Sequence, residues 1–210
     1  MKHRLAVFDF DGTLADSFPF FLASFGELAR IHGFRPLDRS NLDELRRLDA
    51  RQLMRHVGLP AWKAPLVAMD FRRLMAGKTA QIALFDGMPA LLHDLAGAGV
   101  ELAVLSSNSR DNVQAVLGPA LSALISHFDC GVSLMGKQRK LRALLARTGF
   151  APSQTVCVGD EIRDIAAARG VRATVAAVGW GYTLPDALAA HRPDTLAHSV
   201  TQLRQYLGLA

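Results

Sequence analysis

Five short, mostly apolar stretches limit the folds open to this chain more than any other feature of its sequence. They are Leu5–Phe8, Val100–Leu105, Leu124–Phe128, Thr155–Val158 and Ala173–Val178. Because such runs lack regular polar alternation, they indicate strands buried on both faces, as in a parallel sheet covered by helices. Segments with helical periodicity lie between them: Met88–Ala96, Asn112–Leu117, Lys137–Thr148 and Ile162–Arg169. This alternation predicts an α/β domain built on a doubly wound parallel sheet.

The alternation is interrupted between residues 18 and 85. This region contains no convincing strand, and its apolar residues follow helical spacing over Phe18–His32, Leu42–Leu48, Ala50–Val57 and Trp62–Ile82. A helical segment of this length, placed after the first strand, is typical of a small inserted domain. We therefore predict an α/β core formed by residues 1–17 and 86–210, with an α-helical domain over residues 18–85.

The overall composition is that of a soluble globular protein. Half of the 210 residues are apolar and a fifth are charged, and no stretch of about 20 uninterrupted apolar residues is present. The net charge of +5 is compatible with nucleic acid, with a small anionic substrate or with a merely basic surface. Since no nucleic-acid-binding motif accompanies the charge, we expect neither a nucleic-acid nor a membrane partner. The oligomeric state is left open.

The N-terminal region and the cysteines favour a cytoplasmic location. Asp9 and Asp11 interrupt the first apolar run too early for a secretory signal. Cys130 and Cys157 form neither a metal-ligand spacing nor a disulfide framework. We interpret both cysteines as small core residues.

Two carboxylates follow the first predicted strand. Asp9 and Asp11 are two residues apart, so in an extended segment they point to the same side, at the carboxyl end where α/β sheets bind ligands. Two adjacent carboxylates repel each other unless a cation or a shared proton compensates, and Mg²⁺ would also attract a phosphate. Gly12 permits a sharp turn there. A plain acidic turn is the alternative, and it explains Asp11 and Gly12 better than it explains Asp9.

Other polar residues follow later strands. Ser106, Ser107 and Asn108 come after Leu105, although Asn108 or Ser109 could instead cap the next helix. Asp160 follows the fourth apolar run, and Asp164 lies one helical turn beyond it, where two like charges are unfavourable without a cation. Helix capping is again an alternative, and it accounts less well for Asp164.

The stretch from Asp9 to Ser17 resembles the Asp-x-Asp-Gly-Thr-Leu-x-Asp-Ser signature of the haloacid dehalogenase superfamily. The resemblance implies that Asp9 attacks phosphorus and that Asp11 acts as general acid and base. Dehalogenases of this superfamily lack the second Asp, so Asp11 points to the hydrolysis of phosphate esters.

The resemblance also implies roles for the later motifs. Ser106 corresponds to a phosphate-binding residue, and Gly12, Ser107 and Asn108 are expected beside the phosphate. Lys137 is the preferred motif lysine, with Lys140 as the alternative because the family's common Lys-Pro form is missing. The expected cofactor is Mg²⁺, and its implied site consists of Asp9, Asp160, the backbone carbonyl of Asp11 and a supporting Asp164.

The helical insert corresponds to what this superfamily calls a type 1 cap. Arg46 and Arg47 lie in a stretch similar to the cap loop that selects substrates in phosphoglycolate phosphatases and sugar phosphomutases. Their guanidinium groups could bind a second anionic group of the substrate, or they could simply belong to a solvent-exposed face of the insert. The Gly179–Tyr182 loop either borders the site or is a structural turn.

These observations together predict a magnesium-dependent phosphatase that hydrolyses a small anionic phosphomonoester through a phosphoaspartyl intermediate. The implied group is the phosphoglycolate phosphatase-like one. A phosphotransferase such as a sugar phosphomutase is the first alternative, because it would share the catalytic residues. A non-catalytic binding protein on the same scaffold is the second, and the intact set of catalytic residues argues against it.

Overall fold

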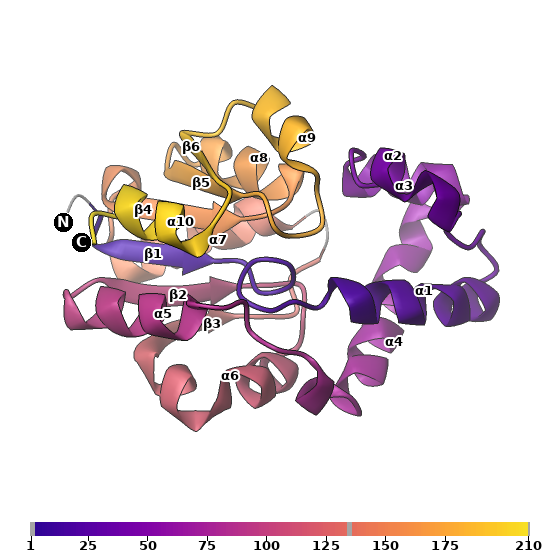
Figure 1. The fold of residues 1–210 in the computed structure, drawn as a ribbon, viewed down its shortest axis with the longest axis horizontal. Helices are drawn as coiled ribbons and strands as arrows, with labels where there is room; N and C mark the ends of the chain where they lie inside the picture. Colours follow the sequence, from indigo (N-terminus) through magenta and orange to yellow (C-terminus); the bar gives the residue numbers. More distant parts are fainter. Residues whose placement is uncertain (1–2, 134–135, 210) are drawn as a thin grey trace.

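The computed structural model describes residues 3–133 and 136–209. Within them, six parallel strands form one sheet in the order β3-β2-β1-β4-β5-β6 (Figure 1). The strands are β1 (Leu5–Phe8), β2 (Glu101–Leu105), β3 (Ile125–Asp129), β4 (Thr155–Gly159), β5 (Thr174–Val178) and β6 (Thr195–Ala197). Strand β1 pairs with β2 on one side and β4 on the other, so the strand order reverses beside β1. This confirms the doubly wound parallel sheet.

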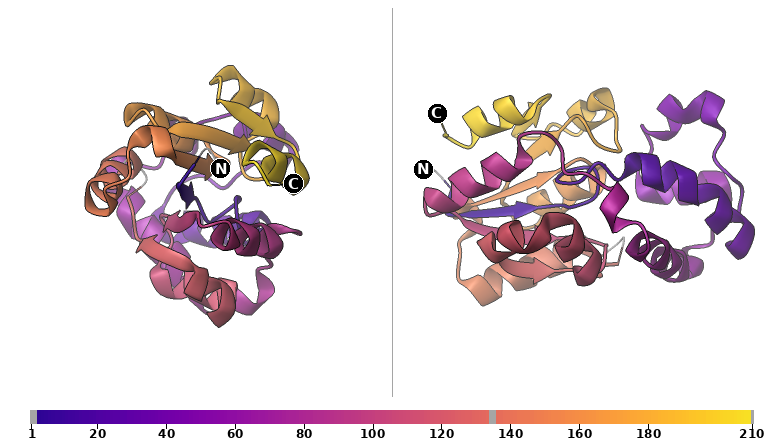
Figure 2. Two further views of the ribbon diagram at one scale, coloured as in Figure 1. Left: turned by 90° about the vertical axis from the view of Figure 1, so that its left-hand side faces the viewer. Right: turned by 60° about the horizontal axis from the view of Figure 1, so that its bottom comes forward.

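Alternate side chains of each strand point to opposite faces of the sheet, and helices cover both faces (Figure 2). Phe8 and Val104 pack on one face, whereas Val7 and Leu105 pack on the other. The first face is covered by α5 (Met88–Gly97), α6 (Arg110–Leu124) and α10 (Val200–Tyr206). The second is covered by α7 (Lys137–Thr148), α8 (Ile162–Gly170) and α9 (Pro185–Ala190). Burial on both faces explains why the strands are so uniformly apolar.

The structure contains all five strands expected from the sequence, with β1 over the expected residues and the ends of the others shifted by no more than one residue. It adds β6 and the helices α9 and α10, which the sequence patterns did not reveal. Strand β6 has only three residues, Thr-Leu-Ala, and its register is set by pairing with β5, where Leu196 lies opposite Ala177. A strand this short carries too little periodicity to be recognised alone.

The insert is helical. It comprises α1 (Phe18–His32), α2 (Leu42–Leu45), α3 (Ala50–Val57) and α4 (Ala64–Ala76), with 3₁₀ turns at Arg39–Asn41, Ala61–Lys63 and Thr79–Gln81. The expectations for α1 and α3 are confirmed. Two helices are shorter than expected. The one predicted over Leu42–Leu48 ends at Leu45, and the one predicted over Trp62–Ile82 is α-helical only over Ala64–Ala76. Phe25, Leu28, Phe34 and Val57 form the small core of this bundle.

Two adjacent crossings join the helical insert to the sheet. The Asp16 amide donates to the Ala83 carbonyl at 2.8 Å, and the Phe85 amide donates to the Leu14 carbonyl at 3.0 Å. The insert, called the cap below, therefore leaves and re-enters the core at one place, beyond the carboxyl end of β1 (Figure 1). We keep residues 18–85 as its proposed extent. In the described part of the chain, no helix is long and apolar enough to cross a membrane.

Candidate active site

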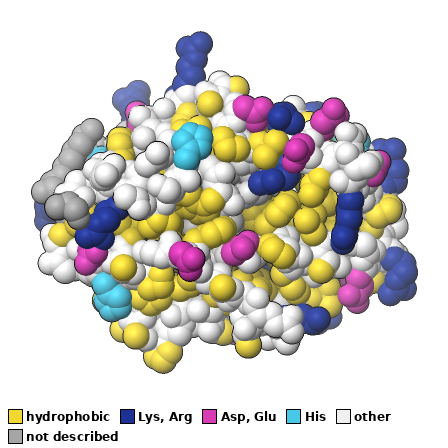
Figure 3. All heavy atoms as spheres, viewed as in Figure 1, with side chains coloured by type: hydrophobic (Ala, Val, Ile, Leu, Met, Phe, Trp, Pro, Cys, Tyr) yellow, Lys and Arg dark blue, Asp and Glu magenta, His cyan; other side chains and the backbone are white. Residues whose placement is uncertain are grey.

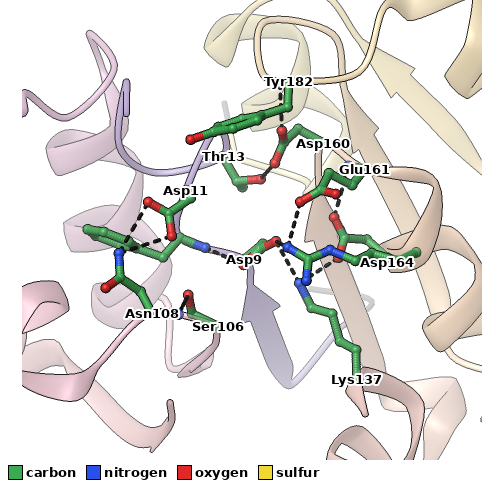
Figure 4. Close-up of polar contacts among 12 residues, drawn as sticks. Asp9, Asp11, Thr13, Ser106, Asn108, Lys137, Asp160, Glu161, Asp164 and Tyr182 are labelled. Carbon is green, nitrogen blue, oxygen red and sulfur yellow. Dashed lines mark hydrogen bonds and ion pairs between the residues drawn. The ribbon is translucent and has the colours of Figure 1, made fainter. Parts of the chain in front are cut away.

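The carboxyl ends of β1, β2 and β4 bring the predicted site residues together on the side of the sheet that faces the cap (Figure 4). Asp9 follows β1, Ser106 follows β2 and Asp160 follows β4. Each is at most 2% exposed. Because these are the strands on either side of the reversal in strand order, the site lies where doubly wound folds bind their ligands.

A buried lysine lies against Asp9. The Lys137 ammonium, at the first residue of α7, is 2.7 Å from Asp9 Oδ2 and 2.5 Å from Asp164 Oδ1. Burial opposes the charge on Lys137, but the two carboxylates outweigh burial and raise its pKa. The Phe10 amide donates to Asp9 Oδ1 at 2.7 Å, which fixes the carboxylate's orientation. Of the two lysines considered from the sequence, the structure thus brings Lys137 to Asp9, while Lys140 is partly exposed.

Three buried carboxylates form a group that could hold a metal ion. One oxygen from each of Asp9, Asp160 and Asp164 lies within 4.8 Å of the others. Burial, followed by the charge of Glu161, raises the pKa of Asp160 well above its ordinary value. Burial also raises the pKa of Asp164 to about 6, although Lys137 opposes that shift. These shifts mean that the ionised carboxylates lack compensation in the protein alone.

The charges around the carboxylate group fit a divalent cation. Arg163 pairs with Glu161 at 2.5 Å and approaches Asp9 Oδ2 at 3.8 Å. If Asp9, Asp160, Glu161 and Asp164 are all ionised, Lys137 and Arg163 neutralise two of the four charges. Two negative charges remain beside hard oxygen donors, a combination that suits Mg²⁺. Arg163 and Glu161 belong to the motif around Asp160, but no role was predicted for either of them.

Asp160 is fixed by residues that sequence reasoning did not select. Thr13 Oγ1 donates to Asp160 Oδ1 at 2.6 Å, and the Tyr182 amide donates to Asp160 Oδ2 at 2.7 Å. The Gly179–Tyr182 loop therefore does border the site. The Tyr182 contact joins segments 22 residues apart, and no short-range pattern could have revealed it.

Gly12 makes room for Asp160. Its φ is +76°, and a Cβ at this position would lie 2.3 Å from Asp160 Oδ2 and 2.4 Å from Tyr182 Cδ2. The Gly12 amide donates to the Ala15 carbonyl at 2.9 Å, so in this structure that N–H closes the turn. Gly12, which was expected beside the phosphate, is thus also the point at which this turn packs against Asp160 of the candidate metal site.

The substitution Gly12→Ala is expected to lower the free energy of unfolding by about 1–3 kcal/mol, because it combines a left-handed backbone with a steric clash. It should also weaken Mg²⁺ binding by displacing Asp160. Thermal denaturation and Mg²⁺ titration measure the two effects. Gly33→Ala is the control, since Gly33 has a similar φ of +70° but an added Cβ would meet no atom within 4 Å. Equal Mg²⁺ affinity in both variants would contradict the role assigned to this contact.

The Asp11 carboxylate lies apart from the carboxylates of Asp160 and Asp164, on the other side of Asp9 in Figure 4. Asn108 Nδ2 donates to its two carboxylate oxygens at 3.1 and 3.3 Å. Burial raises the pKa of Asp11 to about 6, and the charge of Asp9 adds to this shift against the hydrogen bonds from Ser17 and Asn108. A carboxyl group with such a pKa can hold and release a proton near neutral pH.

Ser106, Ser107 and Asn108 form a tight turn after β2. Ser106 Oγ accepts the Asn108 amide at 3.0 Å, and Asn108 Oδ1 accepts the Ser109 amide at 2.9 Å. Ser109 is the residue that caps α6, since its hydroxyl accepts the Asn112 amide at 3.2 Å. Helix capping therefore does not occupy Ser106, whose hydroxyl lies buried beside Asp9 and Asp11 (Figure 4).

The two cap arginines contact the core. Arg46 Nε and Nη2 donate to the carbonyls of Tyr182 at 3.0 Å and Gly181 at 2.8 Å. Arg47 Nε lies 2.9 Å from Asp186 Oδ2, and both of these side chains are well exposed. In this structure Arg46 thus joins the cap to the loop that also holds Asp160, whereas Arg47 joins the cap to α9. Their expected contact with a substrate anion stays a prediction.

The raised pKa values predict an unusual pH dependence of stability in the absence of metal. Asp11 and Asp164 bind protons near pH 6 in the folded state but near pH 3.8 when unfolded. The folded state then binds more protons between these values, so stability increases as the pH falls from 7 to about 5, by about 1–3 kcal/mol. Thermal denaturation with a chelator should show this rise, and saturating Mg²⁺ should stabilise the protein at pH 7 and flatten the profile. A melting temperature that falls steadily on acidification with chelator would contradict this reading.

Comparison with known proteins agrees with this geometry. The family described as haloacid dehalogenase-like hydrolase matches residues 6–178. A phosphoglycolate phosphatase from Synechococcus elongatus is 36% identical over 95% of this chain and 94% of its own length. The tyrosine-protein kinase PtkA of Mycobacterium tuberculosis is 31% identical over 98% of this chain and 73% of its own length. A solved structure of a predicted phosphatase from Clostridium acetobutylicum shares the fold, with a TM-score of 0.82, 20% identity and 99% coverage of both chains. The resemblance drawn from the motifs is confirmed, and the chain belongs to the haloacid dehalogenase-like hydrolase family.

Proposed function

We propose that this protein is a magnesium-dependent phosphatase that hydrolyses a small phosphomonoester through a phosphoaspartyl intermediate on Asp9. The observation that carries the proposal is the position of Asp9 between two different environments. On one side lie Lys137 and the carboxylates of Asp160 and Asp164, and on the other lies Asp11 with its raised pKa. A nucleophile beside a cation site, with a separate proton carrier, is what phosphoryl transfer requires.

In the first step, a carboxylate oxygen of Asp9 attacks phosphorus and the bond from phosphorus to the ester oxygen breaks. Asp11, in its protonated form, gives its proton to the departing alkoxide, which leaves as the alcohol. The pKa of about 6 keeps a fraction of Asp11 protonated near neutral pH. We propose that the hydroxyl of Ser106 and the ammonium of Lys137 bind the oxygens of the transferring phosphoryl group.

In the second step, water attacks the phosphorus of the aspartyl phosphate and the bond to Asp9 breaks, releasing inorganic phosphate. Asp11, now ionised, takes the proton from the attacking water and returns to its starting state. Asn108 holds the Asp11 carboxylate through both steps, since its amide donates to both oxygens. One residue can serve as acid and then as base because each step leaves it ready for the other.

Asp9, Asp160, Asp164 and the backbone carbonyl of Asp11 are the groups we propose to hold Mg²⁺. When bound, the ion neutralises charge on the phosphoryl oxygens and so favours attack by the Asp9 carboxylate. Thr13 and Tyr182 orient Asp160 for this task, and Glu161 contributes by donating its amide to Asp164 Oδ2 at 2.9 Å.

Phosphate release from a panel of phosphomonoesters, measured with Mg²⁺ and with chelator, tests the proposal. Phosphoglycolate belongs in the panel because one relative is named for it. We expect release that depends on Mg²⁺ and falls at least about 100-fold in chelator. A full rate with chelator would remove the metal from the mechanism. Transfer of phosphate between positions of a sugar, without free phosphate, would favour the mutase alternative, which no feature of the structure supports.

We further propose that the protein acts in the cytoplasm. Cys130 and Cys157 are both free in the structure, which accords with a reducing compartment. Burial raises the pKa of the Cys130 thiol to about 11 and that of the Cys157 thiol to about 12, so neither is activated as a nucleophile.

A further inference from the structure

A cavity of about 210 Å³ extends from the carboxyl edge of the sheet into the cap, where it reaches residues of the cap's own small core. Helices α1 to α4 all contribute to its wall, and most of the lining side chains are aliphatic or aromatic, among them Phe21, Leu45, Val67 and Phe71. Figure 3 shows hydrophobic side chains over a broad area where the core meets the cap. The cavity is thus mainly an apolar space.

Aromatic rings form a continuous part of this wall. The Phe21 ring centroid lies 5.3 Å from that of Tyr182 and 6.1 Å from that of Phe71, and the Phe18 centroid lies 5.0 Å from that of Tyr182. Phe18, Phe21 and Phe71 are only partly buried although they belong to a small helical bundle. Partly exposed rings that face a cavity are a typical binding surface for an apolar group.

The polar part of the lining comes largely from the core. Asp11, Ser107 and Asn108 line the cavity, and Asp11 is the residue that gives its proton to the leaving oxygen in the proposed mechanism. The organic part of the ester is bonded to that oxygen. When the phosphoryl group lies at Asp9, the organic part must therefore extend from Asp11 into the space below the cap.

Three arginines line the cavity, and each is engaged by the protein. Arg46 donates to the carbonyls of Gly181 and Tyr182 and lies over the Phe18 ring, with its guanidinium carbon 4.8 Å from the centroid. Arg72 Nη1 donates to the Ser107 carbonyl at 3.0 Å.

The third arginine is at the boundary with the candidate metal site. Arg163 pairs with Glu161 at 2.5 Å and approaches Asp9. A carboxylate that entered the apolar part of the cavity would lose its water and would have to compete for cations that already have partners. An apolar group would meet no such cost.

We propose that this cavity binds an aliphatic or aromatic alcohol group, so that the preferred substrates are phosphomonoesters of apolar alcohols rather than of short hydroxy acids such as glycolate. The inference rests on the proposed function for the position of the phosphoryl group. The affinity of the cavity for an apolar group does not depend on turnover, and it can be measured separately.

Calorimetric binding of phosphonates, which are not hydrolysed, tests the cavity with Mg²⁺ present. Butylphosphonate is expected to bind about 10- to 50-fold more tightly than methylphosphonate, because three added methylenes leave water. It should also bind at least about 10-fold more tightly than 3-phosphonopropionate, which has similar length but carries a carboxylate. Equal affinities, or tighter binding of 3-phosphonopropionate, would overturn the inference.

A matched pair of variants locates the binding surface. Ala68 lines the cavity, whereas Ala23 is exposed on α1. Ala68→Phe fills part of the space, so the butyl-to-methyl affinity ratio should fall to about 3 or less. Ala23→Phe adds the same ring to the cap surface and should keep the full ratio. If both variants keep it, the apolar site lies elsewhere, and if Ala68→Phe does not fold, the three wild-type affinities still decide.

Turnover of methyl, butyl and phenyl phosphates and of phosphoglycolate completes the test. Methyl and butyl phosphates have leaving groups of similar reactivity, so a higher kcat/KM for butyl phosphate reports binding rather than chemistry. Mg²⁺-dependent release from every ester without this preference would refute the inference and leave the phosphatase proposal standing. Selective butylphosphonate binding without phosphate release from any ester would support the cavity and refute the phosphatase.

Discussion

The substitution Asp9→Asn is expected to reduce phosphate release from any substrate by at least about 10⁴-fold, because the amide cannot replace the carboxylate as a nucleophile. The change is nearly isosteric, and it removes a negative charge from a site where Asp160 and Asp164 already repel it. We therefore expect the variant to fold and to melt no lower than the wild type. A steady-state phosphate assay and a thermal melt measure the two effects.

Two further measurements make this test specific to Asp9. Rapid quenching during turnover, followed by borohydride reduction and peptide mass spectrometry, should place the phosphoryl group at position 9 in the wild type. Asp111→Asn is a suitable control, because Asp111 is an exposed carboxylate in the first turn of α6 and its loss should change the rate less than twofold. Activity that survives Asp9→Asn would remove Asp9 from the proposed role.

The substitution Lys137→Met should lower kcat/KM by about 10²–10³-fold, because it removes the buried cation that faces both Asp9 and the incoming phosphate. Methionine keeps much of the apolar stem, so the loss reports mainly on the charge. Asp9 and Asp164 then lose their shared partner, and stability at neutral pH should fall by about 1–3 kcal/mol. Phosphate release and thermal denaturation measure the two effects.

Lys140→Met is the matched control and decides between the two lysines considered from the sequence. Lys140 lies one turn along α7 and is partly exposed, so its substitution should change kcat/KM less than about threefold. Lys137→Arg should not restore the activity, because a planar guanidinium cannot take the place of a compact ammonium between two carboxylates. A larger loss from Lys140→Met than from Lys137→Met would contradict the assignment.

Most of the sheet could be predicted because the local sequence dictates it. A strand buried on both faces must be apolar along its whole length, so β1 and β4 were visible as uninterrupted runs. The helices α1 and α3 could be predicted because each buries one side, so that apolar residues recur at helical spacing. Strand β6 was missed, since three residues at the edge of the sheet depend on pairing with β5 and carry little signal of their own.

The candidate site divides in the same way. Asp9, Asp11 and Asp160 were identified because each follows a predicted strand within a recognisable motif. Thr13 lay inside the motif, but its bond to Asp160 spans 147 residues. Arg163 was adjacent to a selected residue and could have been noticed as a cation next to an acidic motif. The loop that ends at Tyr182 was considered from the sequence, but its bond to Asp160 was not, because Tyr182 acts through a backbone amide that any residue would supply.

The sequence by itself determined the alternation of strands and helices as far as β5, the position of the helical insert and the residues of the three strand ends, because each follows from local periodicity or from a contiguous motif. Tertiary structure decided which lysine meets Asp9, that Arg46 and Arg47 contact the core, and that the cap encloses an apolar cavity. These features depend on side chains brought together from distant parts of the chain, within the core for Lys137 and between cap and core for the other two. Such distances are set by packing, which sequence spacing does not encode.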